Sequence, residues 1–129
     1  MENSVGKAER ELIWVVMSEF FVDNEIDHDR EAAQISRFPM NVLKEIFFRE
    51  VAPVCGPNML TPAPAVWAGF DSAWVVSQIN SLLSSKERSL IRRISYEASV
   101  LYYRLRLADV WSEVEDAIKR ERTGQARRS

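Results

Sequence analysis

The stretch ERELIWVVMSEFF, residues 9–21, decides the fold. Its large apolar side chains would cover most of the circumference of a helix: they are Leu12, Ile13, Trp14, Val15, Val16, Met17, Phe20 and Phe21. They do not alternate with polar residues as the side chains of a half-buried strand do. Because a helix with so little polar surface is usually central to a core, we expect a core helix from about Lys7 to Val22, with Ser4 as its cap.

Two further helices are predicted on the C-terminal side of this stretch. Asp27 is placed to cap a short helix over about His28–Ser36. Pro39 suits the first turn of the next helix, because the N–H that proline lacks is not needed there. That helix should run to about Val51 and end at Pro53.

The segment that follows is rich in proline. Residues 53–64, PVCGPNMLTPAP, contain four prolines and a glycine and predict irregular structure. We expect one long Pro-rich loop over about residues 53–70. The rings of Trp67, Phe70, Trp74 and Trp111 should pack this loop against the helices. The alternative is that some of these rings are exposed and mark a partner surface.

The C-terminal half predicts long helices. Asp71 is placed to cap a helix from about Ser72 to Leu83. Ser84 and Glu87 fit the capping box of the helix that follows. The apolar side chains of that helix keep helical spacing and are Leu90, Ile91, Ile94, Ala98, Leu101, Leu105 and Ala108. A last helix could restart at Asp109, or the long helix could continue through it.

No part of the sequence alternates at the period of two that a strand requires. The predicted fold class is therefore all-α, a compact bundle of five or six helices. Residues 1–122 should form a single helical domain, since 129 residues is a common length for one domain. Residues 123–129 should be a frayed or disordered basic tail. The helix that contains residues 12–17 is apolar enough for a subunit interface as well as for a monomer core, so the oligomeric state stays open.

The composition excludes several kinds of site. One histidine, His28, excludes a site built on two imidazoles, and one cysteine, Cys55, excludes an internal disulfide. The four glycines lack the spacing of a dinucleotide- or phosphate-binding loop. The acidic run that starts at Asp23 lacks the glycine and the glutamate that a calcium loop needs. We therefore expect no catalytic residues, no cofactor and no metal, and an enzyme is disfavoured.

The sequence also bears on the compartment. The longest apolar run is residues 12–17, far short of the roughly 20 residues that span a bilayer. The first eleven residues include three glutamates, unlike the start of a signal peptide. With a single thiol as well, we expect a cytoplasmic protein that makes no membrane contact.

The charges are unevenly distributed along the chain. Residues 1–64 carry six basic and eleven acidic side chains, a net charge of −5, whereas residues 65–129 carry eleven basic and eight acidic ones, a net charge of +3. The acidic excess is concentrated in Glu19, Asp23, Glu25, Asp27, Asp29 and Glu31. Such asymmetry can steer association with an oppositely charged partner, although the same charges could simply solvate two faces of the domain.

Three segments carry a resemblance to known sequences. They are ERELIWVVMSEFFVDNEID (residues 9–27), EVAPVCGPNML (residues 50–60) and VWAGFD (residues 66–71). These segments are similar to a small proteobacterial domain family of unknown function. The resemblance implies a mainly helical, stand-alone bacterial protein, and it brings no catalytic residues with it.

The leading hypothesis for function is a non-enzymatic protein–protein interaction module. The six acidic side chains would face a basic surface of another protein and speed the encounter, and an apolar contact through Phe21 or Ile26 would hold the complex. One form of this hypothesis is an immunity-type protein that occludes the basic surface of a toxin. The alternative is a nucleic-acid-binding regulator that uses the basic helix Lys86–Arg106, where Tyr102 or Tyr103 could stack on bases.

Overall fold

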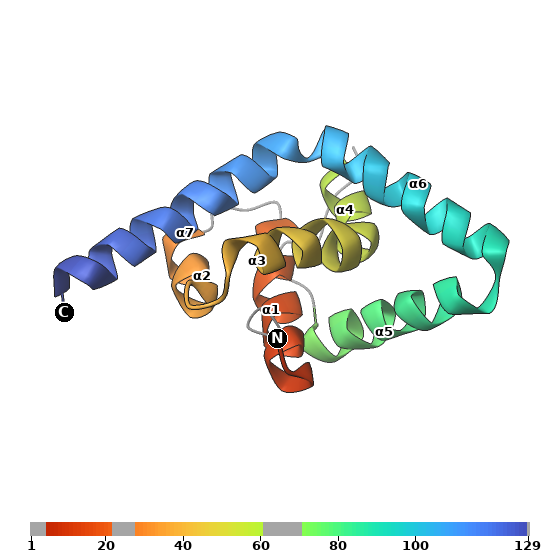
Figure 1. The fold of residues 1–129 in the computed structure, drawn as a ribbon, viewed down its shortest axis with the longest axis horizontal. Coiled ribbons are helices and arrows are strands. Elements are labelled where there is room, and N and C mark those ends of the chain that lie inside the picture. The colour runs from red at the N-terminus through yellow and green to blue at the C-terminus, as the bar shows by residue number, and fades with distance from the viewer. Residues whose placement is uncertain (1–4, 22–27, 61–70, 129) are drawn as a thin grey trace.

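A computed structural model of the chain describes residues 5–21, 28–60 and 71–128 (Figure 1). Its elements, in chain order, are α1 (Lys7–Ser18), the 3-10 turn η1 (Glu19–Phe21), α2 (His28–Ile35), α3 (Met40–Ile46), the π-helical segment η2 (Phe47–Val51), α4 (Ala52–Leu60), α5 (Ser72–Arg88), α6 (Leu90–Arg106) and α7 (Ala108–Arg128). The described residues contain no strand, so the all-α prediction is confirmed. Since η1 continues α1, and α3, η2 and α4 are contiguous, the described helices form six continuous segments, which agrees with the expected bundle.

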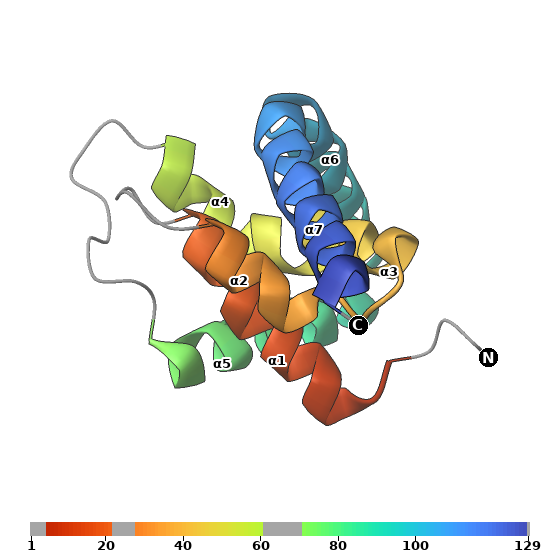
Figure 2. The same cartoon turned by 90° about the vertical axis from the view of Figure 1, so that its left-hand side faces the viewer.

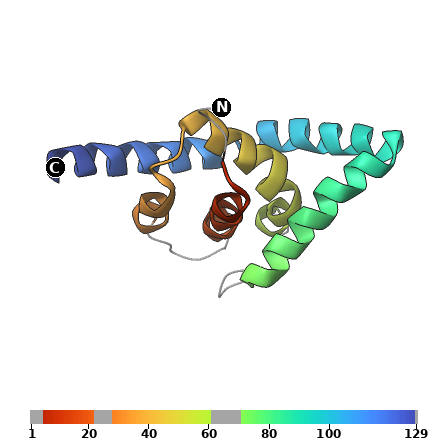
Figure 3. The ribbon, with the colours of Figure 1, turned by 60° about the horizontal axis from the view of Figure 1, so that its bottom comes forward.

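Helix α1 is central, as its apolar sequence predicts. The buried side chains of α1 and η1 include Ile13, Trp14, Val16, Met17, Phe20 and Phe21. Helix α1 contacts α2, α3, α5 and η2, and Figure 3 shows it with α2 on one side and α4 and α5 on the other. The helix begins at Lys7 as predicted, but its N-cap is Gly6, whose N–H donates to Glu9 Oε1 at 3.1 Å. Ser4, the expected cap, and Val22, the expected end, lie outside the described residues.

The next helices begin at or directly beside the predicted residues. Helix α2 begins at His28, and Asp27, its expected cap, lies outside the described residues. Helix α3 begins at Met40, directly after Pro39, which is its N-cap residue.

The prediction that Pro53 ends the helix is wrong. The chain stays helical through η2 and α4 to Leu60, so residues 53–60 of the expected Pro-rich loop are helical, and residues 61–70 lie outside the described part of the chain. In a regular helix the carbonyl of Arg49 would accept the N–H of residue 53, and proline has none. The hydroxyl of Tyr96, in α6, donates to that carbonyl instead. The π-helical segment η2 ends two residues before Pro53, so the turn that precedes the proline ring is not a regular α-helical one.

Helices α5 and α6 form a hairpin. Asp71 caps α5 as predicted, because its Oδ2 accepts the N–H of Trp74 at 2.9 Å. The helix continues past Leu83 to Arg88, since neither glycine nor proline interrupts residues 72–88. Residues 84–87 are therefore inside α5 and do not form the expected capping box. The cap of α6 is Ser89, whose Oγ accepts the N–H of Arg92 at 3.5 Å.

Helices α6 and α7 lie end to end along one side of the molecule. Figure 2 shows them on the side opposite α1 and α5. The break between them is at Leu107, with φ −112° and ψ 19°, and α7 begins at Ala108 rather than at Asp109. A helix break near the expected position is thus present.

Helix α7 packs on α2 and continues beyond the expected end of helical order at residue 122. The guanidinium of Arg122 donates to the carbonyl of Ser36 at 2.8 Å and to that of Phe38. These bonds hold this part of α7 on the turn between α2 and α3. The helix then runs on to Arg128, where we expected a frayed or disordered tail from residue 123.

The core is organised round the ring of Phe47 in η2. Its centroid lies 5.2 Å from that of Phe21, 5.0 Å from that of Phe48 and 5.2 Å from that of Trp111. These rings come from η1, η2 and α7. The aromatic cluster therefore joins the beginning, the middle and the end of the chain.

Candidate functional site

The predicted acidic site lies only partly in the described region. The members outside it are Asp23, Glu25, Ile26 and Asp27. Asp29 Oδ1 accepts two hydrogen bonds from the guanidinium of Arg120 in α7, at 2.7 and 3.2 Å. Glu31 accepts a bond from the side-chain amide of Gln34 at 3.2 Å. Burial, and next the charge of Glu31, raise the pKa of Glu19. Asp29 and Glu31 are therefore engaged with groups of their own chain, whereas Glu19 is partly desolvated and lies within the field of another carboxylate.

Phe21, which we expected to hold a partner, is fully buried. Its ring stacks on that of Phe47 with an interplanar angle of 24°. The all-round apolar sequence of residues 12–21 places this ring in the core. Phe21 consequently has no exposed surface to offer another protein.

The aromatic rings expected to pack the Pro-rich loop have different surroundings. Trp67 and Phe70 lie outside the described residues. Trp111 is buried beside Phe47 and Phe48. Trp74 is 43% exposed. This ring therefore agrees with the alternative expectation that some of these aromatic side chains are exposed.

The residues considered for catalysis or metal binding do not form a site in the described part of the chain. Burial raises the pKa of the Cys55 thiol to about 12, so this thiol stays protonated at neutral pH. Glu50 accepts hydrogen bonds from Trp14 Nε1 at 2.7 Å and from Arg10 at 2.6 Å, which joins η2 to α1. No group of three histidine, cysteine, aspartate or glutamate side chains among the described residues could hold a metal ion.

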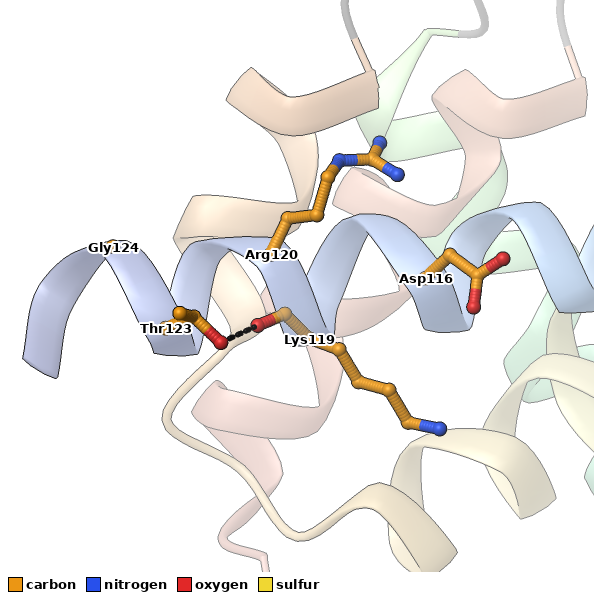
Figure 4. A pocket seen from close by; sticks show the side chains of 5 residues that line it. All are labelled: Asp116, Lys119, Arg120, Thr123 and Gly124. Carbon is orange, nitrogen blue, oxygen red and sulfur yellow. Dashed lines mark hydrogen bonds between the residues drawn. The ribbon is translucent and has the colours of Figure 1, made fainter.

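The described surface has a depression of about 560 Å³ along α7. Figure 4 shows the residues that line it: Asp116, Lys119, Arg120, Thr123 and Gly124. The side chains of Arg120 and Lys119 point in different directions in that view, and Arg120 is paired with Asp29. Thr123 donates to the carbonyl of Lys119 in its own helix. The polar groups of this depression therefore do not converge on one point.

The most unusual surface lies on α6. Apolar side chains of an amphipathic helix normally face the core, but here several large ones are exposed. Leu90, Ile91 and Leu105 are between 72% and 75% exposed, and Ile94 and Leu101 are each 60% exposed. These residues form an exposed apolar strip along α6, and exposed apolar surface of this kind often marks an interaction site.

The spacing within this strip is that of a coiled coil. Five exposed positions follow one another at alternating intervals of three and four residues, and they are Ile91, Ile94, Ala98, Leu101 and Leu105. We call these five residues the α6 seam. Such spacing gives a narrow apolar line that fits a second helix. Figure 1 shows α6 along the outer edge of the molecule, with α4 and α5 on its inner side.

The inner face of α6 is fixed to the rest of the chain. Tyr96, Val100 and Tyr103 are its buried residues. Burial raises the pKa of Tyr96 to about 12, so its hydroxyl remains a donor to the carbonyl of Arg49. A Cβ added to Gly56 in α4 would lie 2.6 Å from Cε1 of Tyr103, so α4 and α6 approach closely at this glycine. The α6 seam is therefore held outward by specific contacts on the opposite face.

Charged side chains flank the seam. Glu97 accepts two bonds from Arg49, at 2.6 and 3.2 Å, and Arg104 donates to Glu45 at 3.0 Å. The side chains of Glu97 and Arg104 are 51% and 32% exposed, respectively. Each therefore retains surface for a further charged neighbour.

The sequence contained a signal for this surface that our prediction did not use. Helical spacing over residues 90–108 predicts only an apolar face, whereas the strict alternation of intervals of three and four residues indicates a seam. Tyr96 and Tyr103, seven residues apart, occupy the opposite side of the same helix. The structure, and not the sequence, shows that this tyrosine face is the one in contact with the rest of the chain.

No helix in residues 5–21, 28–60 or 71–128 is both long and apolar enough to cross a membrane. Neither a curated protein nor a solved structure matches the chain. A family model described as "Domain of unknown function (DUF7079)" matches residues 8–117, which agrees with the resemblance seen in the sequence. The chain belongs to this family.

Proposed function

We propose that the protein is a non-enzymatic protein–protein interaction module of the bacterial cytoplasm, and that it contacts its partner through the α6 seam. One observation carries the proposal. The apolar side chains of the seam are exposed, while the opposite face of α6 is fixed by Tyr96 and Tyr103. Burial of one leucine or isoleucine side chain contributes about 1.5–3 kcal/mol, so a partner that covers the seam would gain substantial affinity.

The spacing of the seam residues supports a partner that contacts them with a helix. Its residues lie on one face of a 17-residue helix, which is about 25 Å long. An apolar line with alternating intervals of three and four residues packs against a similar line of another helix. The partner would therefore present an amphipathic helix.

The acidic-surface form of the hypothesis, including an immunity-type role, stays a prediction. It depends on Asp23, Glu25 and Asp27, which lie outside the described residues. Within the described part, Asp29 is already paired with Arg120. The α6 seam is therefore the stronger basis for an interaction.

Nucleic-acid binding through Lys86–Arg106 also stays a prediction. Lys86 Nζ lies 4.5 Å from the ring centroid of Tyr96, and Arg92 donates to Ser85 Oγ at 3.1 Å. These cations are thus in contact with neighbouring side chains of their own chain. The aliphatic side chains between them favour a protein partner over phosphates.

The proposal is tested by photo-crosslinking in cells that naturally produce the protein. A photoreactive amino acid replaces Ile94 in the full chain, and the control replaces Asn80, an exposed residue of α5. We expect a crosslink to a protein from position 94 that is several times stronger than from position 80. Mass spectrometry should map it to an amphipathic helix, and adding Leu101→Lys should abolish it.

Two outcomes would contradict the proposal. The first is a crosslinking yield at position 94 no higher than at position 80. The second is a crosslink from position 94 to nucleic acid that weakens steeply with salt, which would favour the nucleic-acid alternative.

A further inference from the structure

We propose that the partner of the α6 seam is a second copy of this chain, with the two α6 helices packed antiparallel. This inference rests on the proposed function of the seam and names its occupant. In a two-fold dimer the same patch of each subunit forms the interface, so the patch must be complementary to itself. The α6 seam meets that requirement in both the size and the charge of its side chains.

The sizes are complementary when the helices run in opposite directions. The seam has two alternating kinds of position. In an antiparallel pair, each kind on one helix faces the other kind on the second helix. With the two-fold axis between Ser99 and Val100, Ala98 faces Leu101 of the second copy, and Ile94 faces Leu105 of the second copy. The small side chain of Ala98 makes room for the larger one. A parallel pair would instead place Ala98 opposite its own counterpart and leave a gap.

The charges are complementary in the same arrangement. Glu97 and Arg104 occupy equivalent flanking positions of the seam, one heptad apart. About the same axis, Glu97 of one copy lies beside Arg104 of the other. Glu97 is paired with Arg49, and Arg104 with Glu45, within each chain. The dimer would therefore line up Arg49, Glu97, Arg104 and Glu45 across the interface, with the charges alternating in sign.

The length of the seam sets the expected strength of the dimer. Standard interfaces bury about 800 Å² per partner. A single pair of helices about 25 Å long is at the low end of this range. We therefore expect a dimer that dissociates in the micromolar range.

The first experiment is sedimentation equilibrium of the full chain over a micromolar dilution series. We expect a mass that rises with concentration to twice the 14.9 kDa of one chain. Leu101→Lys should raise the dissociation constant by roughly tenfold or more, because a lysine is then placed in the seam. Asn80→Lys adds the same charge at an exposed site of α5 and should leave the dissociation constant unchanged.

Exchange of the flanking charges tests the antiparallel arrangement. Glu97→Arg and Arg104→Glu should each weaken self-association, because each places like charges side by side. An equimolar mixture of the two variants should recover the affinity of the original dimer, since every cross-subunit pair is then of opposite sign. Each variant loses one ion pair within its own chain, both alone and in the mixture. Recovery in the mixture therefore reports the contact between the subunits.

Three outcomes would overturn the proposal. They are a chain that is monomeric throughout the series, a dimer indifferent to Leu101→Lys, and a mixture of charge variants that associates no better than either one alone. A monomer whose position 94 crosslinks to a different protein rejects the second copy and keeps the proposed function. A monomer whose position 94 crosslinks no better than position 80 rejects both.

Discussion

Helices α1 and α6 are both rich in large apolar side chains, yet they place them in opposite environments. In α1 the side chains of Ile13 and Met17 are fully buried. In α6 the comparable side chains of Ile91 and Leu105 are about three-quarters exposed. The residues of α6 that reach the core are instead Val100 and two tyrosines.

The difference lies in how much of each helix surface the core requires. Helix α1 has helices on several sides, so apolar residues around most of its circumference find contacts. Helix α6 lies at the edge of the molecule and needs only one buried face (Figure 1). Aliphatic residues on the other face add little to the folding of one chain, because most of their surface remains in water. Their regular spacing is explained if a second helix covers them.

The largest expected contrast in the free energy of unfolding is between the removal of a core ring and the removal of a seam side chain. Phe21→Ala should lower the free energy of unfolding by about 3–5 kcal/mol, because it removes a ring stacked on Phe47. Ile94→Ala should change it by less than about 0.5 kcal/mol, because most of the side chain is already exposed to water. Urea unfolding at low protein concentration, where any dimer is dissociated, measures both values.

The comparison would fail if Ile94→Ala were as destabilising as Phe21→Ala under those conditions. That result would place the seam in the core of a single chain. At high protein concentration we expect Ile94→Ala to become destabilising, since a dimer is then part of the folded state.

The second prediction concerns the close approach of α4 and α6. Gly56→Ala should lower the free energy of unfolding by about 1–3 kcal/mol, because the added methyl group meets the ring of Tyr103 at 2.6 Å. In a Tyr103→Ala background the same substitution should be neutral or stabilising, since the obstructing ring is gone and alanine favours a helix. Urea unfolding of the original chain, of the two single variants and of the double variant gives the coupling between positions 56 and 103 in the free energy of unfolding. A cost that is equal in both backgrounds would show that the ring is not the cause.

The third prediction concerns Pro53 inside a helix. Tyr96→Phe should cost about 1–2 kcal/mol in the free energy of unfolding, because the carbonyl of Arg49 then lacks the hydroxyl donor. Pro53→Ala supplies a backbone N–H at the position that a regular helix uses for this carbonyl. Tyr96→Phe should therefore cost less in the Pro53→Ala background. Equal costs in the two backgrounds would rule out the hydroxyl as a substitute for the missing N–H.

Local signals in the sequence predicted the parts of the fold that local chemistry determines. The carboxylate of Asp71 caps α5 as expected, and the helices that start at Lys7 and His28 begin where they were predicted. The central place of α1 also followed from its apolar circumference. Each of these features depends on residues a few positions apart.

The failures involve residues far apart in the sequence. Pro53 was expected to end a helix, but the donor that compensates for its missing N–H is Tyr96, in a different helix. Likewise, the sequence of α6 shows its apolar line but not which neighbours would leave that line exposed. That outcome depends on the contact of Tyr103 with Gly56. In the acidic site, Asp29 pairs with Arg120, which lies near the other end of the chain. The sequence could not show this pairing.

The smallest expected effects on stability come from two carboxylates, Glu19 near the core and Glu97 on α6. The hydrogen bond from Arg49 lowers the pKa of Glu97, so Glu97 adds stability at neutral pH that is lost as the pH falls through its folded pKa. Burial raises the pKa of Glu19, so the ionised form costs stability at neutral pH, and this cost disappears below the ordinary value of 4.5. Glu97→Gln should therefore lower the free energy of unfolding at neutral pH by about 0.2–1 kcal/mol, and Glu19→Gln should raise it by less than about 1 kcal/mol. Both differences should vanish in acid.

Urea unfolding of the two variants at neutral and at acidic pH checks these signs, with the original chain measured alongside. Added salt should reduce the effect of Glu97→Gln, because the pair with Arg49 is exposed to solvent. The effect of Glu19→Gln should respond less to salt, since burial is the larger cause of its raised pKa. If the two variants shifted stability in the same direction at neutral pH, the environment assigned to one of these carboxylates would be incorrect. Opposite signs would show that even the charged residues follow the division between a desolvated interior near α1 and a hydrated edge along α6.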